Sequence, residues 1–119
     1  MDPSLSRALR GDVIARNLAY GEQRRLEIGR ALATRPKLLM LDEPTAALGV
    51  RESHQMLSLI ERLRNQGKAI VIVSHNLLHV FRIADRITVL RGGRIVGSRR
   101  KSQTDADEIV KMITGADML

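Results

Sequence analysis

The sequence contains no cysteine and no tryptophan, and its only aromatic side chains are Tyr20 and Phe81. The lack of cysteine excludes disulfides and thiolate metal sites, so we expect a reducing compartment. The longest apolar runs, such as AIVIV at 69–73, are far too short to span a bilayer, and the first residues lack the apolar region of a secretory signal. We therefore expect any role at a membrane to depend on a partner.

The formal net charge is +7, which raises the question of nucleic-acid binding. The scarcity of aromatics removes the stacking platform that single strands need, and the basic residues are spread along the chain apart from RRK at 99–101. We therefore expect no nucleic-acid partner. A solvated basic surface, or a domain cut from a larger and more balanced protein, explains the charge better.

Hydrophobic periodicity over the first two thirds of the chain predicts helices that alternate with buried strands. A helix is expected over 21–34, a fully buried strand over 37–41, a helix over 51–66 that ends at Gly67, and a second buried strand over 69–74. In the helix over 51–66, the residues expected to be buried are Met56, Leu57, Ile60 and Leu63.

The last third of the chain predicts a helix over 76–84, then a hairpin of strands 86–91 and 94–99 joined by Gly-Gly. A final helix starts after Asp105 and ends at Gly115, and we expect it to bury Ile109, Val110 and Ile113. The predicted fold class is α/β, with a mostly parallel sheet, flanking helices and a C-terminal β-hairpin plus helix.

Two adjacent carboxylates, Asp42 and Glu43, follow the strand over 37–41. Ligands gather at the carboxyl ends of strands in open α/β sheets, and Mg²⁺ favours one or two carboxylates together with phosphate oxygens. Asp42 is thus a candidate metal ligand, and Glu43 is a candidate to polarise a water molecule. The alternative is a strand that ends at the surface with two solvated acids.

The stretch NLAYGEQRRLEIGRALATRPKLLMLDEPTAAL (17–48) resembles the ATP-binding subunit of ABC transporters, from the signature motif through the Walker B strand. In that family the signature segment grips the γ-phosphate of an ATP held by the opposite subunit. We expect Gly21 to open a helix whose free N–H groups form an anion site. The corresponding residues here are Leu18, Ala19, Tyr20, Gly21, Glu22 and Gln23.

His75 directly follows the strand over 69–74, in the place of the family's switch histidine, which contacts the γ-phosphate. The hairpin ADRITVLRGGRIV that follows it also matches the family. Residues 12–41 look most like branched-chain amino-acid importers, whereas DEPTAALGVRES and the region from VIVSHN onward resemble monosaccharide importers. The longer match favours a sugar.

The phosphate-binding loop of the family is missing, because no G-x-x-x-x-G-K-[ST] occurs in the chain. We therefore predict a single truncated ABC ATPase domain, a partial P-loop NTPase over 1–119, with a signature part at 1–34 and a Walker B to C-terminal part at 35–119. Ala19 replaces the usual signature serine, which weakens nucleotide contact by about 1.5–3 kcal/mol without abolishing it. Gly49 replaces an aspartate, as in many sugar-importer subunits.

The resemblance implies ATP and Mg²⁺ as cofactors, with Asp42 on the metal, Glu43 orienting the water and His75 sensing the γ-phosphate. It implies a transmembrane permease and a second ATP-binding subunit as partners, and a cytoplasmic location on the inner face of the cell membrane. The family is an ATPase family, but we expect no hydrolysis by this chain alone, because the phosphate-gripping half is missing.

Several other functions stay open. The chain could be a non-catalytic interaction half-domain, a gene remnant, or a subunit of a branched-chain amino-acid importer. DNA-repair and chromosome-structuring ATPases are disfavoured because no sustained heptad pattern occurs, and translation-associated ABC proteins because Ala46-Ala47 replaces Asn-His. In the family fold the strand before the phosphate loop pairs beside AIVIV, so we expect an unpaired apolar edge and poor solubility or marginal stability.

Overall fold

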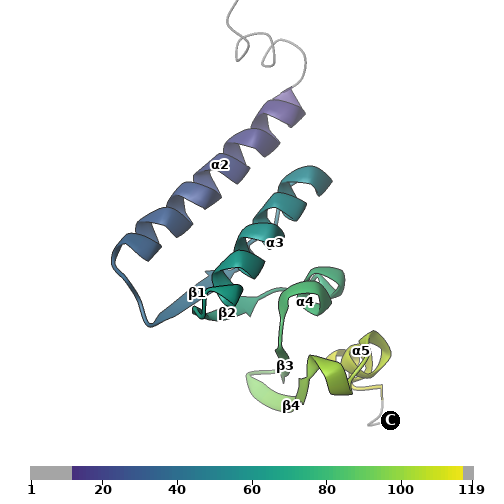
Figure 1. Ribbon diagram of the computed structural model, residues 1–119. Helices are drawn as coiled ribbons and strands as arrows, with labels where there is room; N and C mark the ends of the chain where they lie inside the picture. The colour runs from purple at the N-terminus through teal and green to yellow at the C-terminus, as the bar shows by residue number, and fades with distance from the viewer. Residues whose placement is uncertain (1–11, 117–119) are drawn as a thin grey trace, which may run out of the picture. The chain divides into compact units, whose positions relative to one another are not determined.

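The computed structural model describes residues 12–116, which form two compact units that divide between Ser74 and His75. Figure 1 shows the order of the elements along the chain. The α/β fold class is confirmed, since helices alternate with strands from residue 12 to residue 91 and only the hairpin over 86–100 departs from that order. The predicted division of the domain at residue 34 stays a prediction.

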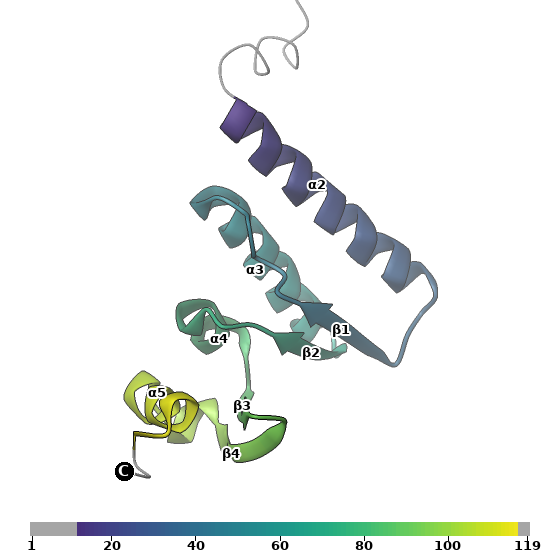
Figure 2. The ribbon, with the colours of Figure 1, turned by 180° about the vertical axis from the view of Figure 1, so that it is seen from behind.

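The first unit holds two helices and a pair of strands. They are α2 (Asp12–Ala33), β1 (Leu38–Asp42), α3 (Val50–Asn65) and β2 (Ala69–Val73). The two strands are parallel, as predicted, and α2 and α3 lie side by side (Figure 2). The β1–α3–β2 segment is thus a strand–helix–strand unit, the element from which parallel sheets are built.

The core of this unit comes from α3 and its neighbours. All the residues predicted to be buried in α3 are buried, and Ile28 of α2 and Leu39 of β1 join them. The helix ends as predicted: Gly67 adopts a left-handed φ of 86°, and the Lys68 N–H donates to the Leu63 carbonyl at 3.1 Å. Glycine suits this place because it has no Cβ to clash with the following carbonyl.

Helix α2 corrects one prediction about the signature segment. The helix begins at Asp12, so Gly21 lies within it and does not open it. Residues 12–20 contain no proline and several good helix formers. An internal glycine lowers the stability of a helix by only about 1 kcal/mol, and the helix-forming residues on both sides of Gly21 can offset this loss.

The strands of the first unit are not fully buried, contrary to the prediction. Side chains alternate between two faces, with Leu39 6% exposed and its neighbour Met40 69% exposed. Leu38, Val71 and Val73 are also exposed. Among residues 12–116, β1 and β2 pair only with each other, which confirms the unpaired edge of β2 and leaves one apolar sheet face without a covering layer.

The second unit is a hairpin with helices packed on it. Its elements are α4 (Leu77–Ile83), β3 (Arg86–Arg91), β4 (Arg94–Arg100), a 3-10 turn η1 (Lys101–Gln103) and α5 (Ala106–Thr114). The hairpin is antiparallel, and Gly92 and Gly93 both have positive φ, as the favoured two-residue hairpin turn requires. The described strands therefore form one parallel and one antiparallel pair in separate sheets, and the mostly parallel sheet is not formed by these residues.

Helix α5 covers the hairpin with a narrow face. Ile109 packs with Ile87 and Val89 of β3 in the core of the second unit, and Met112 packs against them. Val110 and Ile113 are exposed, so their predicted burial was wrong. A short helix on a two-stranded hairpin presents one stripe of side chains to it, and these two residues lie outside that stripe.

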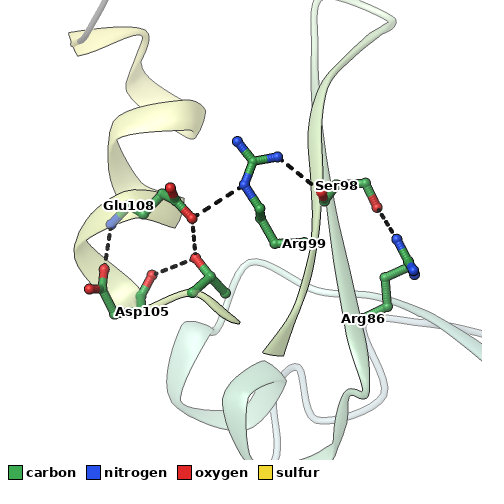
Figure 3. A network of polar contacts seen from close by, with 6 residues as sticks. Arg86, Ser98, Arg99, Asp105 and Glu108 are labelled. Atoms are coloured by element: carbon green, nitrogen blue, oxygen red, sulfur yellow. Dashed lines mark hydrogen bonds and ion pairs between the residues drawn. The ribbon is translucent and has the colours of Figure 1, made fainter. Parts of the chain in front are cut away.

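Both ends of α5 form as predicted. The Glu108 N–H donates to Asp105 Oδ1 at 2.8 Å, and Gly115 closes the helix in a left-handed conformation. The Glu108 side chain also accepts a hydrogen bond from Thr104 and pairs with Arg99 at 3.4 Å. Figure 3 shows Glu108 beside Arg99. Part of the basic RRK stretch thus has a partner within the unit. Exposed ion pairs of this kind contribute at most about 1 kcal/mol, so the helix depends mainly on Ile109.

The exposed apolar sheet face predicts poor solubility, and polar substitutions on this face should improve it. Met40 and Val71 are directly opposite each other across the strands. Replacing them together by Met40→Glu and Val71→Lys should raise the soluble monomer fraction, while the free energy of unfolding changes by less than about 1 kcal/mol. Size-exclusion chromatography with light scattering and urea unfolding measure the two quantities.

The matched control is Leu39→Ala on the buried face of the same strand, which should cost about 2–5 kcal/mol. A parent chain that is a monodisperse monomer with a cooperative transition well above room temperature contradicts the prediction. So does a double variant that loses as much stability as Leu39→Ala.

Candidate functional site

The two predicted carboxylates lie at the carboxyl end of the parallel strand pair. Asp42 is the last residue of β1 and pairs with Val73, the last residue of β2. The Glu43 N–H then donates to the Val73 carbonyl at 2.7 Å, which extends the pairing by one residue. Asp42 is exposed and Glu43 is half-buried. The structure therefore brings both acids to the carboxyl ends of the strands, where ligands bind in α/β folds.

The main chain turns sharply directly after β1. Glu43 has a φ of 47° and Ala47 a φ of 63°, both left-handed, and Pro44 and Thr45 between them are buried. Non-glycine residues in this region cost about 1–3 kcal/mol and persist only where the surroundings hold them. Such conformations gather at functional sites, so the turn supports a role for Glu43 beyond that of a solvated acid.

A side chain that the sequence analysis did not single out holds this turn. Arg24 of α2 donates from Nη1 to the Glu43 carbonyl oxygen at 2.7 Å, and the Ala46 N–H donates to the same oxygen at 3.1 Å. Arg24, Asp42 and Pro44 also line a small recess beside β1. The sequence carried one signal, since Arg24 comes directly after the LAYGEQ segment, but arginine at that place has many possible partners.

The acidic side chains at this end of the strands provide part of the ligand set of a Mg²⁺ ion. Within the described range 12–116, no group of three or more His, Asp or Glu side chains could hold a metal ion. Asp42 fits as one oxygen ligand, with Glu43 next to it. Mg²⁺ is usually bound through one or two carboxylates and completed by phosphate oxygens and water, so these residues fit the metal's protein side but do not form a site by themselves.

The predicted nucleotide-contact segment lies inside α2. Ala19, Glu22 and Gln23 are exposed, whereas Gly21 is buried beside Glu52 of α3. The side chains of Leu18 and Tyr20 lie outside the described part of the structure. In a helix interior each N–H bonds to the carbonyl four residues earlier, so the predicted anion site of free N–H groups is absent at Gly21. In this conformation the main chain at Gly21 offers no free N–H group to a phosphate.

His75 is exposed and opens the second unit, directly before Asn76. Asn76 is the N-cap of α4, where its side chain accepts a hydrogen bond from the His79 N–H at 3.2 Å. His75 follows Val73, the partner of Asp42, by two residues. Its role toward a nucleotide stays a prediction. In the part of the chain that the structure describes, no helix is long and apolar enough to cross a membrane.

Comparisons with known proteins all show similarity to proteins of ABC transporters. The family model described as ABC transporter matches residues 4–46. The chain is 46% identical over 107 residues to the ribose import ATP-binding protein RbsA of Chromobacterium violaceum, and 46% identical over 102 residues to that of Geobacillus kaustophilus. These matches cover 90% and 86% of this chain but only 21% of each relative, so the chain spans about one fifth of the curated relatives' length.

Solved structures agree with this result. The ATP-binding cassette MJ1267 in its ADP conformation matches with a TM-score of 0.66 at 29% identity, covering 82% of this chain and 37% of that one. The cassette MJ0796 bound to ADP and Pi matches with a TM-score of 0.60 at 30% identity, covering 68% and 35%. The predicted resemblance to the ATP-binding subunits of ABC transporters is thereby confirmed, and the chain is similar to part of an ABC ATPase domain.

Proposed function

We propose that this chain contributes the metal and water side of the ATP site in a sugar-importing ABC transporter. The observation that carries the proposal is the parallel β1–β2 pair, which ends in Asp42 and Glu43 within a sequence 46% identical to ribose import ATP-binding proteins. In this role the protein acts by positioning the reacting groups and by stabilising electrostatically the transfer of the phosphoryl group to water.

The roles of the individual residues follow from their chemistry and place. Asp42 supplies an oxygen ligand to Mg²⁺, which when bound neutralises charge on the phosphates. Glu43, half-buried at the end of β1, orients the attacking water and accepts its proton. His75 contacts the γ-phosphate. Of the residues from Leu18 to Gln23, the exposed Ala19, Glu22 and Gln23 are the ones that we expect to face a nucleotide on a partner subunit.

The substrate class and the partners follow from the relatives. The relatives named above are ribose import proteins, which supports a monosaccharide over a branched-chain amino acid. A transmembrane permease and a second ATP-binding subunit complete such an importer, with this chain on the cytoplasmic face of the membrane. The ATP site itself needs a phosphate loop, which this chain does not contain.

A second candidate, a non-catalytic half-domain that pairs with another ATP-binding subunit, is favoured by a specific observation. Among the described residues, the outer edge of β2 is unpaired and the sheet face bearing Met40 and Val71 is exposed. Such a surface can accept a strand or a layer from another chain. The capture experiment below separates this function from that of a remnant without a partner.

The purified chain should not hydrolyse ATP. The sequence lacks the phosphate loop, which is the element that holds the β- and γ-phosphates in line for attack. Phosphate release with Mg²⁺ should therefore equal that of the Glu43→Gln variant, which removes the carboxylate proposed to take the proton. Magnesium-dependent turnover that is lost in Glu43→Gln would refute the prediction.

Magnesium binding should require a nucleotide and a phosphate-binding loop that holds this nucleotide. Asp42 and Glu43 provide too few ligands, so titration calorimetry of the chain with MgCl₂ should show no saturable binding at submillimolar concentrations. The control is Asp42→Asn, which should give the same trace. Stoichiometric binding by the parent that disappears in Asp42→Asn would show a complete site and contradict the assignment.

Capture of a full-length relative tests the nucleotide-facing segment. Immobilised chain should retain the RbsA protein of Chromobacterium violaceum more strongly with ATP and Mg²⁺ than with ADP. Ala19→Glu sets a carboxylate against the partner's phosphates and should abolish the ATP-dependent part of the capture. Ala33→Glu, at another exposed alanine of α2 outside the segment, is the matched control.

Each result of that capture decides between the functions. Equal capture with and without nucleotide, unaffected by Ala19→Glu, supports the non-catalytic half-domain. No capture under any condition contradicts both proposed functions.

A further inference from the structure

Glu43, the proposed water-orienting residue in the turn after β1, is held by an arginine from helix α2. Arg24 lies in α2, directly after the LAYGEQ segment, and its Nη1 donates to the Glu43 carbonyl at 2.7 Å. The side chain is half-buried, which strengthens the interaction of the guanidinium with the carbonyl dipole. The two residues are 19 positions apart, so this contact arises from packing and not from local chain geometry.

The main chain of Glu43 needs such support. Its φ of 47° is left-handed, a conformation that residues with a Cβ adopt rarely. On the amino side, the Glu43 N–H is fixed to the Val73 carbonyl of β2 at 2.7 Å. On the carboxyl side, the carbonyl accepts from Arg24 and from the Ala46 N–H at 3.1 Å. Arg24 thus links this turn to α2.

The direction in which a side chain leaves the main chain is set by the backbone dihedrals. An extended residue after β1 would continue the alternation of the strand and point its side chain to the opposite face from Asp42. The left-handed conformation of Glu43 breaks that alternation directly after Asp42. Whatever fixes this conformation therefore fixes the direction in which the Glu43 side chain leaves the main chain relative to that of Asp42.

We propose that Arg24 is a positioning residue for Glu43, which acts by clamping the Glu43 carbonyl and thereby orienting the carboxylate beside Asp42. The importance of this orientation for hydrolysis rests on the proposed function, whereas the clamp itself does not. A guanidinium suits the task because it offers several donors in a rigid plane, while a lysine offers a single flexible ammonium group.

The chain supplies a matched control in the next residue. Arg25 is on the same helix and is exposed, and its Nη2 contacts Oε1 of Gln55 in α3. Replacing either arginine by methionine removes one positive charge and keeps an unbranched side chain that favours helix. A difference between Arg24→Met and Arg25→Met therefore reports the contact with Glu43 and not the loss of charge from α2.

Hydrogen–deuterium exchange of the full chain, measured by mass spectrometry at low protein concentration without nucleotide, tests the clamp. In Arg24→Met the amides of Glu43 and Ala46, read in peptides over 42–48, should exchange about ten- to a hundredfold faster than in the parent, since a charged hydrogen bond is lost. Exchange in α3 should stay unchanged. Arg25→Met should leave both regions as in the parent, and Arg24→Lys should restore part of the protection at 42–48.

Two results would overturn the proposal. One is exchange over 42–48 that is the same in Arg24→Met and Arg25→Met. The other is equal acceleration over 42–48 and over α3 in both Arg24→Met and Arg24→Lys, which would assign Arg24 to general stability of the unit. Because no nucleotide is present, failure of the proposed function in the capture experiment leaves this result unaffected, and the two failures are distinguishable.

Discussion

The parallel pairing of β1 with β2 is the interaction on which the first unit and its candidate site depend. The pairing places Asp42 opposite Val73 and lets the Glu43 N–H bond to the Val73 carbonyl, so the two acids leave the sheet at one point. It also turns Leu39 toward the core shared with Ile28 of α2 and Met56 of α3. A slip of one residue would exchange the two faces and move Leu39 into solvent.

This pairing leaves one apolar face of the sheet exposed, and no other described residues cover it. A parallel sheet normally has both faces covered, and its strands are apolar for that reason. Here the strands keep this composition, with Leu38, Met40, Val71 and Val73 on the outer face, but the described chain supplies a layer on one side only. The exposed face agrees with the comparisons, in which this chain aligns with about a third of the solved cassettes.

The second unit is supported mainly by contacts among its own residues. Its hairpin turn, the Asp105 cap and the Gly115 end all come from local sequence, and its core of Ile87, Val89 and Ile109 is internal. Antiparallel hairpins need only a two-residue turn, whereas a parallel pair needs a crossover. At one end of α5, Glu108 adds polar contacts with Thr104 and Arg99. Figure 3 shows Arg99 beside Glu108.

Local sequence determined most of the elements and both acids of the candidate site, because caps, glycine turns and apolar runs act over a few residues. Gly67, Asp105 and the Gly-Gly turn all do what the pattern predicts. Tertiary structure decided what no local pattern contains: the continuation of α2 through Gly21, the exposed outer sheet face, and the clamp of Arg24 on Glu43. Each of these depends on which distant segments are present to pack, and the period of a sequence carries no information about that.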